Sequence, residues 1–239
     1  MKKLLVSAFA LAAFAGPAMA ADLYTPAQAM YDWNGAYLGG HAGYLWGDAS
    51  IKEDFGPSYG GDFDGFIGGV IGGWNFQSGN WVFGIEGDFG WTGADGTGAV
   101  MCDDCESEIY TYDMNWNAHV RGRAGIALGE EGRTVLFIAG GLAVADFKVG
   151  EQGIQGWSDG GTFTGWTIGG GVNHAFSNNL IAGLEVLYDD YGSKSYSSDS
   201  DYVVCEVACA AAPPLDRGSE KVSIDAVTLR GTLTYHFTY

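Results

Sequence analysis

The stretch WVFGIEGDFGW, residues 81–91, changes character at almost every residue. Its odd positions are mostly large and apolar, from Trp81 to Trp91, whereas its even positions include Glu86 and Asp88. Because successive side chains of a β-strand point to opposite faces, this period of two predicts a strand with one apolar and one polar face. A Trp at each end of the apolar face is typical of a strand that meets the two interfaces of a bilayer.

The same period recurs along most of the chain and predicts eight strands in all. In the fourth of them, Tyr112, Met114 and Trp116 are expected on the apolar face, opposite Asn115 and His119. The expected strands are Tyr37–Trp46, Gly65–Phe76, Trp81–Trp91, Tyr112–Ile126, Val135–Phe147, Phe163–Phe176, Leu180–Tyr188 and Val227–Phe237.

The connections between these strands alternate in length. Long ones are expected over 48–63, 92–110, 149–162 and 192–223, and short ones over 77–80, 128–133 and 177–179. Long and short connections on opposite rims are typical of an up-and-down barrel in an outer membrane. The predicted fold class is therefore all-β, an eight-stranded antiparallel up-and-down transmembrane β-barrel. The alternative is a soluble sandwich or a lipocalin-like barrel, which would bury the apolar face instead of exposing it.

Composition supports a strand-rich chain and excludes one large function class. The 239 residues include 40 Gly and only 17% charged residues, and the formal net charge is -18. Gly weakens helix interiors, so such a chain favours strands. Nucleic-acid binding is not expected, because phosphate recognition needs a basic surface.

The N-terminus has the pattern of a secretory signal peptide. Lys2 and Lys3 precede an apolar run that ends in Ala-Met-Ala at residues 18–20, and this run is too short to span a bilayer. We expect residues 1–20 to be a signal peptide, 21–32 a periplasmic N-terminal arm and 33–239 the barrel domain. The expected location is the outer membrane of a Gram-negative cell.

Seven short stretches carry a resemblance to a known family. They include the C-terminal segment that ends at Tyr235. Tyr235, Phe237 and Tyr239 are alternating aromatic residues that resemble the signal read by the outer-membrane insertion machinery. The stretches are Trp33–Gly39, Gly73–Phe76, Gly84–Asp88, Arg121–Gly125, Gly165–Gly171, Tyr188–Gly192 and Leu229–Tyr235.

In their order and spacing these stretches resemble the small eight-stranded outer-membrane barrel proteins of alphaproteobacteria. Members of that family are surface immunogens, often labelled porin-like, and are related in fold to the barrel of outer-membrane protein A and to opacity proteins. The resemblance implies an envelope protein and surface antigen. It does not cover the cysteine pairs or the long last connection, so functions that depend on loops do not carry over.

Charged residues on the polar faces are expected to meet inside the barrel. An eight-stranded barrel is only wide enough for side chains to fill it, and buried charges need partners. We predict that these charged side chains pair with one another and fill the lumen as a structural plug. The alternative is that they form a catalytic pair or an ion pathway. The expected lumen network consists of Glu86, Asp88, His119, Arg121, Arg123, Glu185 and Arg230.

The four cysteines form two close pairs in long connections. Cys102 and Cys105 make one, Cys205 and Cys209 the other, and disulfides are the default outside the cytoplasm, with three possible connectivities. A zinc site is the alternative that the spacing leaves open. Otherwise no metal, cofactor or catalytic residue is predicted: residues 156–160 match G-x-S-x-G, but a strand pattern follows where that motif needs a helix.

The predicted function is structural: an envelope barrel with acidic surface loops, in contact with outer-membrane lipid and lipopolysaccharide. A narrow porin for small solutes is the alternative. A membrane enzyme acting on lipid is the second alternative.

Overall fold

A computed structural model describes residues 30–53, 59–100, 108–152, 158–197 and 219–237. All eight strands are present, and each pairs antiparallel with its neighbours in the sequence. The barrel closes where β1 pairs with β8, from Tyr37 opposite His236 to Glu53 opposite Glu220. The strands are β1 Gly35–Glu53, β2 Tyr59–Ser78, β3 Trp81–Val100, β4 Glu108–Leu128, β5 Thr134–Gln152, β6 Ser158–Ala175, β7 Leu180–Ser197 and β8 Ser219–His236.

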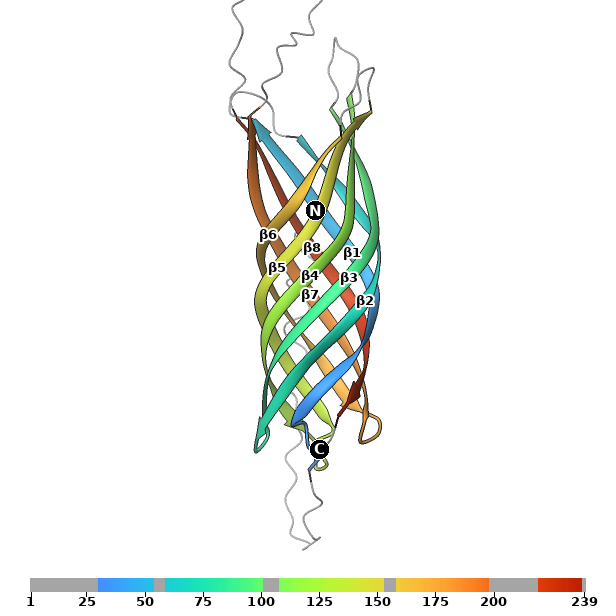
Figure 1. Ribbon diagram of the computed structural model, residues 1–239, viewed down its shortest axis with the longest axis vertical. Helices are drawn as coiled ribbons and strands as arrows, with labels where there is room; N and C mark the ends of the chain where they lie inside the picture. The colour runs from blue at the N-terminus through green and yellow to red at the C-terminus, as the bar shows by residue number, and fades with distance from the viewer. Residues whose placement is uncertain (1–29, 54–58, 101–107, 153–157, 198–218, 238–239) are drawn as a thin grey trace, which may run out of the picture.

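The predicted fold class is confirmed, and the strands are inclined to the long axis of a tall, narrow barrel (Figure 1). The three short turns lie together at one end, the bottom of Figure 1. In the first of them Gly79 has a φ of 61°, a left-handed conformation that favours glycine. Within the described ranges, no helix is long and apolar enough to cross a membrane.

The outer surface carries an apolar band between two rings of aromatic side chains. On β3, Trp81, Ile85 and Trp91 are 54%, 65% and 61% exposed. Ten residues span about 33 Å along a strand, or roughly 25 Å along the barrel axis at a tilt near 40°. That height equals the apolar band of outer-membrane barrels. The lower aromatic ring lies next to the short turns, and the upper aromatic ring includes Trp46, Trp91 and Trp166.

The strands continue well past the upper aromatic ring, so the long connections are shorter than expected. β7 runs to Ser197 instead of Tyr188, and β8 begins at Ser219 instead of Val227. Above the ring, exposed positions carry polar residues such as Asp64 and Asp95. The apolar alternation ends where the wall leaves the membrane, but backbone pairing does not depend on it, so the pattern underestimates strand length.

The orientation of two side chains at the start of β4 was predicted wrongly. Tyr112 and Met114 are buried inside the barrel rather than on its outer face, with exposures of 0% and 2%. The pairing register of β4 shifts between Met114 and Trp116, so that one extra residue, Asn115, enters the strand. Such a β-bulge reverses which residues face inward on its two sides. Below the bulge the expected alternation holds, with Asn117, His119 and Arg121 buried.

Candidate functional site

The register of the sheet brings the expected lumen residues into one layer. Glu86 on β3 lies opposite Arg121 on β4, and Asp88 lies opposite His119. Glu185 on β7 lies opposite Arg230 on β8. Side chains paired in this way are close enough for direct contact. Their exposures are all below 8%, so these charges are removed from water and depend on one another.

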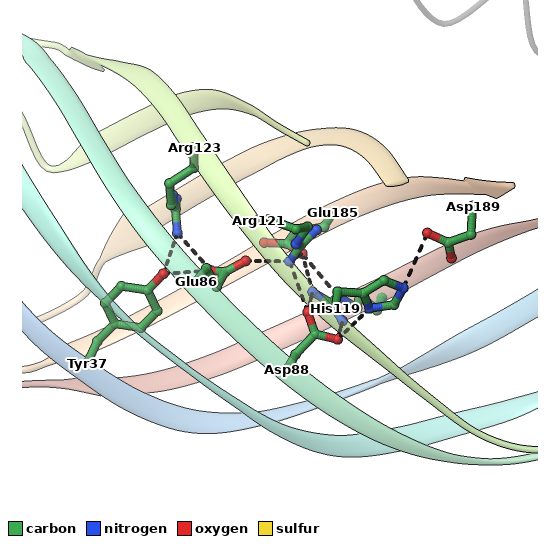
Figure 2. A network of polar contacts seen from close by, with 9 residues as sticks. Tyr37, Glu86, Asp88, His119, Arg121, Arg123, Glu185 and Asp189 are labelled. Atoms are coloured by element: carbon green, nitrogen blue, oxygen red, sulfur yellow. Dashed lines mark hydrogen bonds and ion pairs between the residues drawn. The ribbon is translucent and has the colours of Figure 1, made fainter. Parts of the chain in front are cut away.

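The ion pairs form a single network, as the expected lumen residues do in Figure 2. Arg230 holds Glu185 with Nη2 to Oε2 at 2.9 Å and reaches Asp88, on the far side of the barrel, with Nη1 to Oδ1 at 2.8 Å. Arg121 contacts Glu86 and approaches Glu185 Oε2 to 3.4 Å. The pairs thus tie β3 and β4 to β7 and β8 across the lumen.

Arg123 holds the edge of this network nearest the short turns. Its Nη1 lies 3.0 Å from Glu86 Oε2, and it donates to the hydroxyl of Tyr37 at 3.1 Å. The Tyr37 hydroxyl donates in turn to Glu86 Oε2 at 2.6 Å. The Arg123 guanidinium also lies 4.0 Å from the ring centre of Phe137, a cation–π contact.

Two members of the network were not predicted. One is Tyr37, which lies on the inner face of β1 and is 5% exposed. The other is Asp189, which is fully buried and lies 3.2 Å from Nε2 of His119. Asp189 has the same parity in β7 as Glu185, so extending the period of two by two residues past Leu187 would have found it.

The short-turn end of the lumen is closed by the segment before β1. Trp33 is 1% exposed; its Nε1 donates to Gly132 O at 2.7 Å, and its backbone N–H donates to Gln77 Oε1 at 2.8 Å. The Tyr31 hydroxyl donates to Asn178 O at 2.8 Å. These two residues therefore reach all three short turns. Burial raises the pKa of Tyr31 to about 12, so its hydroxyl remains a donor at neutral pH.

Apolar side chains fill the lumen around Trp33 and again at the opposite end. Near the long connections, Phe147 is 1% exposed and packs edge-on against Phe63, with ring centres 5.0 Å apart. Tyr112 and Phe163 also flank Phe147. The alternation alone did not predict this aromatic cluster, because β4 enters it only after the bulge.

Some of the predicted sites lie outside the described residues. These are Cys102, Cys105, Cys205, Cys209, Tyr239 and the signal peptide, while Tyr235 and Phe237 are exposed on the outer wall. In the part of the chain that the structure describes, no group of three or more His, Cys, Asp or Glu side chains could hold a metal ion.

The comparisons with known proteins agree with this architecture. The profile of the family described as outer membrane protein beta-barrel domain matches residues 5–237. The chain belongs to that family. A 22 kDa outer membrane protein of Rhizobium leguminosarum bv. viciae is 34% identical over 176 residues, which cover 73% of this chain and 72% of that protein.

Relatives in Brucella share most of the barrel as well. A 31 kDa outer-membrane immunogenic protein of Brucella melitensis is 33% identical over 219 residues, or 82% of this chain and 89% of the relative. The crystal structure of the outer membrane protein OprG from Pseudomonas aeruginosa shares the fold, with a TM-score of 0.51 at 12% identity, over 88% of this chain and 99% of that one. The expected family and location are confirmed: this family member is a Gram-negative outer-membrane barrel.

Proposed function

We propose that this outer-membrane barrel protein has a structural role in the cell envelope and is neither a solute channel nor an enzyme. The observation that carries the proposal is the filling of its lumen. Going up the barrel axis, the interior contains the Trp33 base, then the ion-pair layer around Arg121, then the aromatic cluster around Phe147. A barrel of eight strands has no width to spare for a water column beside these side chains.

The outer wall supports a role at the cell surface. Above the upper aromatic ring, Asp residues lie directly opposite one another on neighbouring strands, as with Asp64 and Asp95, and Asp95 and Asp113. This negatively charged wall faces the region of lipopolysaccharide head groups, which we propose as its immediate surroundings. The relatives named immunogenic proteins fit a surface position.

Conductance in planar bilayers tests the closed lumen. The purified barrel should insert without producing steady channels, while a general porin in the same bilayers provides the positive control. Phe66→Ala, which changes a side chain on the outer wall, should behave like the wild type because it leaves the lumen filled. Large, steady, ion-selective channels would contradict the proposal and favour the narrow porin.

A deletion strain tests the enzymatic alternative. A structural protein predicts unchanged acyl chains and head groups in the outer-membrane lipids, whereas a defined change in one lipid class, reversed by the gene in trans, would favour a lipid-acting enzyme.

The exposed aromatic side chains at the C-terminus fit a role in assembly. Tyr235 and Phe237 lie on the lipid-facing wall with ring centres 5.1 Å apart. We propose that the insertion machinery recognises them. Replacing both by Ser should reduce the amount of barrel in the outer membrane more than it reduces the stability of barrels refolded in detergent. Equal effects on both would contradict recognition.

A further inference from the structure

The buried charges of the lumen do not balance if only the arginines are counted. Four carboxylates are buried there, against three guanidinium groups, in the part of the chain that the structure describes. One negative charge is therefore left without a compensating cation, at a depth where an unpaired charge is strongly unfavourable. The carboxylates are Glu86, Asp88, Glu185 and Asp189, and the guanidinium groups are Arg121, Arg123 and Arg230.

The position of His119 indicates where the missing positive charge resides. Its Nδ1 lies 2.8 Å from Asp88 Oδ1, and its Nε2 lies 3.2 Å from Asp189 Oδ1, the second contact being an ion pair rather than a well-aligned hydrogen bond. An ionised carboxylate only accepts hydrogen bonds, and a neutral imidazole carries one N–H and one lone pair. A neutral His119 would therefore point a lone pair at a carboxylate on one side.

We propose that His119 is held as an imidazolium that bridges Asp88 and Asp189, and that its proton acts as a pH-dependent clamp between β3–β4 and β7. Losing this proton leaves two buried carboxylates facing an uncharged ring, where their charge is costly. Above the pH at which a free histidine titrates, near 6.5, the folded barrel holds a proton that the unfolded chain has lost. Stability contributed by the clamp thus falls as pH rises and is fully present only below that value.

The groups surrounding His119 support this assignment. Arg121 of β4 and Arg230 of β8 both contact Asp88. Both also contact Glu185 of β7, so these two guanidinium groups already pair with carboxylates other than Asp189. The Tyr191 hydroxyl donates to Asp189 Oδ2 at 3.3 Å and brings no positive charge. On β5 the residue opposite His119 is Ala143. Among the described groups, His119 is left as the cation for Asp189.

The lumen also contains a matched control. His41 on β1 is 5% exposed, and neither of its ring nitrogens has a hydrogen-bond partner among the described residues. Both histidines are buried in the same barrel, yet only His119 lies between two carboxylates. An effect of burial alone would shift the protonation of both histidines in the same direction, whereas the clamp keeps only His119 protonated.

Nitrogen NMR on histidine-labelled barrel protein in bilayers measures the charge state directly. At pH 7.5, His119 should show both ring nitrogens protonated and His41 should show one, the two signals being assigned with His119→Gln and His41→Gln. A neutral His119 at that pH would overturn the proposal.

The pH dependence of unfolding provides the second test. Unfolding releases the His119 proton. As pH rises from 7 to the pH at which folded His119 loses that proton, the unfolding equilibrium constant of the wild type should therefore increase by up to tenfold per pH unit. Asp189→Asn should remove most of that dependence, because the remaining three carboxylates are balanced by three arginines. Asp64→Asn, on the outer wall, should leave it unchanged.

A double-mutant cycle separates the clamp from simple packing. If His119 is an imidazolium, His119→Gln should destabilise the barrel less when Asp189 is already Asn. Equal cost in both backgrounds would mean that His119 only fills space, and a pH dependence that survives Asp189→Asn would overturn the clamp. Stability set by sodium or potassium concentration instead of pH would do the same, since a bound cation would then supply the missing charge.

Discussion

In its middle the lumen is filled by ion pairs around Arg121, whereas toward the end with the long connections it is filled by aromatic rings around Phe147. Both regions are almost fully buried, and both close the same narrow barrel. They differ in what a lost side chain leaves behind. In the middle it leaves partners with uncompensated charge, and at the end it leaves an apolar cavity. Closure of the lumen can therefore be achieved by either chemistry, but only the ionic layer depends on every partner being present.

The largest effect is expected from Arg121→Ala. Removing this guanidinium leaves Glu86 and Glu185 short of a partner and should lower the free energy of unfolding by about 3–5 kcal/mol. Urea unfolding in lipid vesicles measures it. Arg133→Ala is the control, because Arg133 is about one-third exposed and pairs with the exposed Glu131, where such pairs contribute about 1 kcal/mol or less. Its other contacts are a 3.4 Å donation to Ala175 O and a cation–π contact with the Tyr31 ring, and neither leaves a buried carboxylate unpaired. Similar losses for the two variants would contradict the dependence of the middle layer on its partners.

A somewhat smaller effect is expected from Phe147→Ala in the aromatic cluster. The cavity it leaves should cost about 3 kcal/mol, while Phe147→Leu should retain most of the stability because it keeps the site apolar and largely filled. Thermal unfolding followed by gel mobility measures both. Phe66→Ala, on the exposed wall, should cost far less. If Phe147→Leu were as damaging as Phe147→Ala, the cluster would depend on specific partners, as the ionic layer does.

On the outer wall at the same depth as the ion pairs, Ile85→Lys should cost about 2 kcal/mol. A lysine at the bilayer midplane faces lipid without a partner, although its long side chain can reach toward the interface. Thr97→Lys, exposed above the upper aromatic ring on the same strand, should have almost no effect in the same urea titration. Equal costs at both positions would argue that Ile85 does not lie in the membrane.

The smallest effect concerns the Trp33 base at the short-turn end of the lumen. Trp33→Phe keeps most of the apolar volume but removes the indole donor to Gly132 O, which should cost about 1 kcal/mol. Trp91→Phe, on the exposed wall, is the control for loss of an indole elsewhere. Calorimetry in detergent resolves the difference. A loss as large as that of Arg121→Ala would mean that the base, rather than the ion pairs, limits the stability of the barrel.

Much of this architecture follows from local sequence alone. The alternation that runs from Trp81 to Trp91 predicts both the strand and its inward residues, since side-chain direction in a strand depends only on parity. The neighbour relationship of Glu86 with Arg121 follows as well, because consecutive strands of an up-and-down barrel pair with each other. The sequence thus determined the fold, the lipid-facing surface and most members of the polar layer.

Tertiary structure decided three further features, each of which depends on residues far apart in the chain. The bulge at Asn115 turned Tyr112 inward, and a one-residue shift of this kind is set by the pairing of β4 with its neighbours rather than by its own pattern. Barrel closure brought Arg230 to Asp88, across the lumen from its own hairpin. The segment before β1 folded back as the base, because the assembled turns provide acceptors for Tyr31 and Trp33. Parity is a local property of a strand, whereas contacts across the lumen exist only once the barrel has closed.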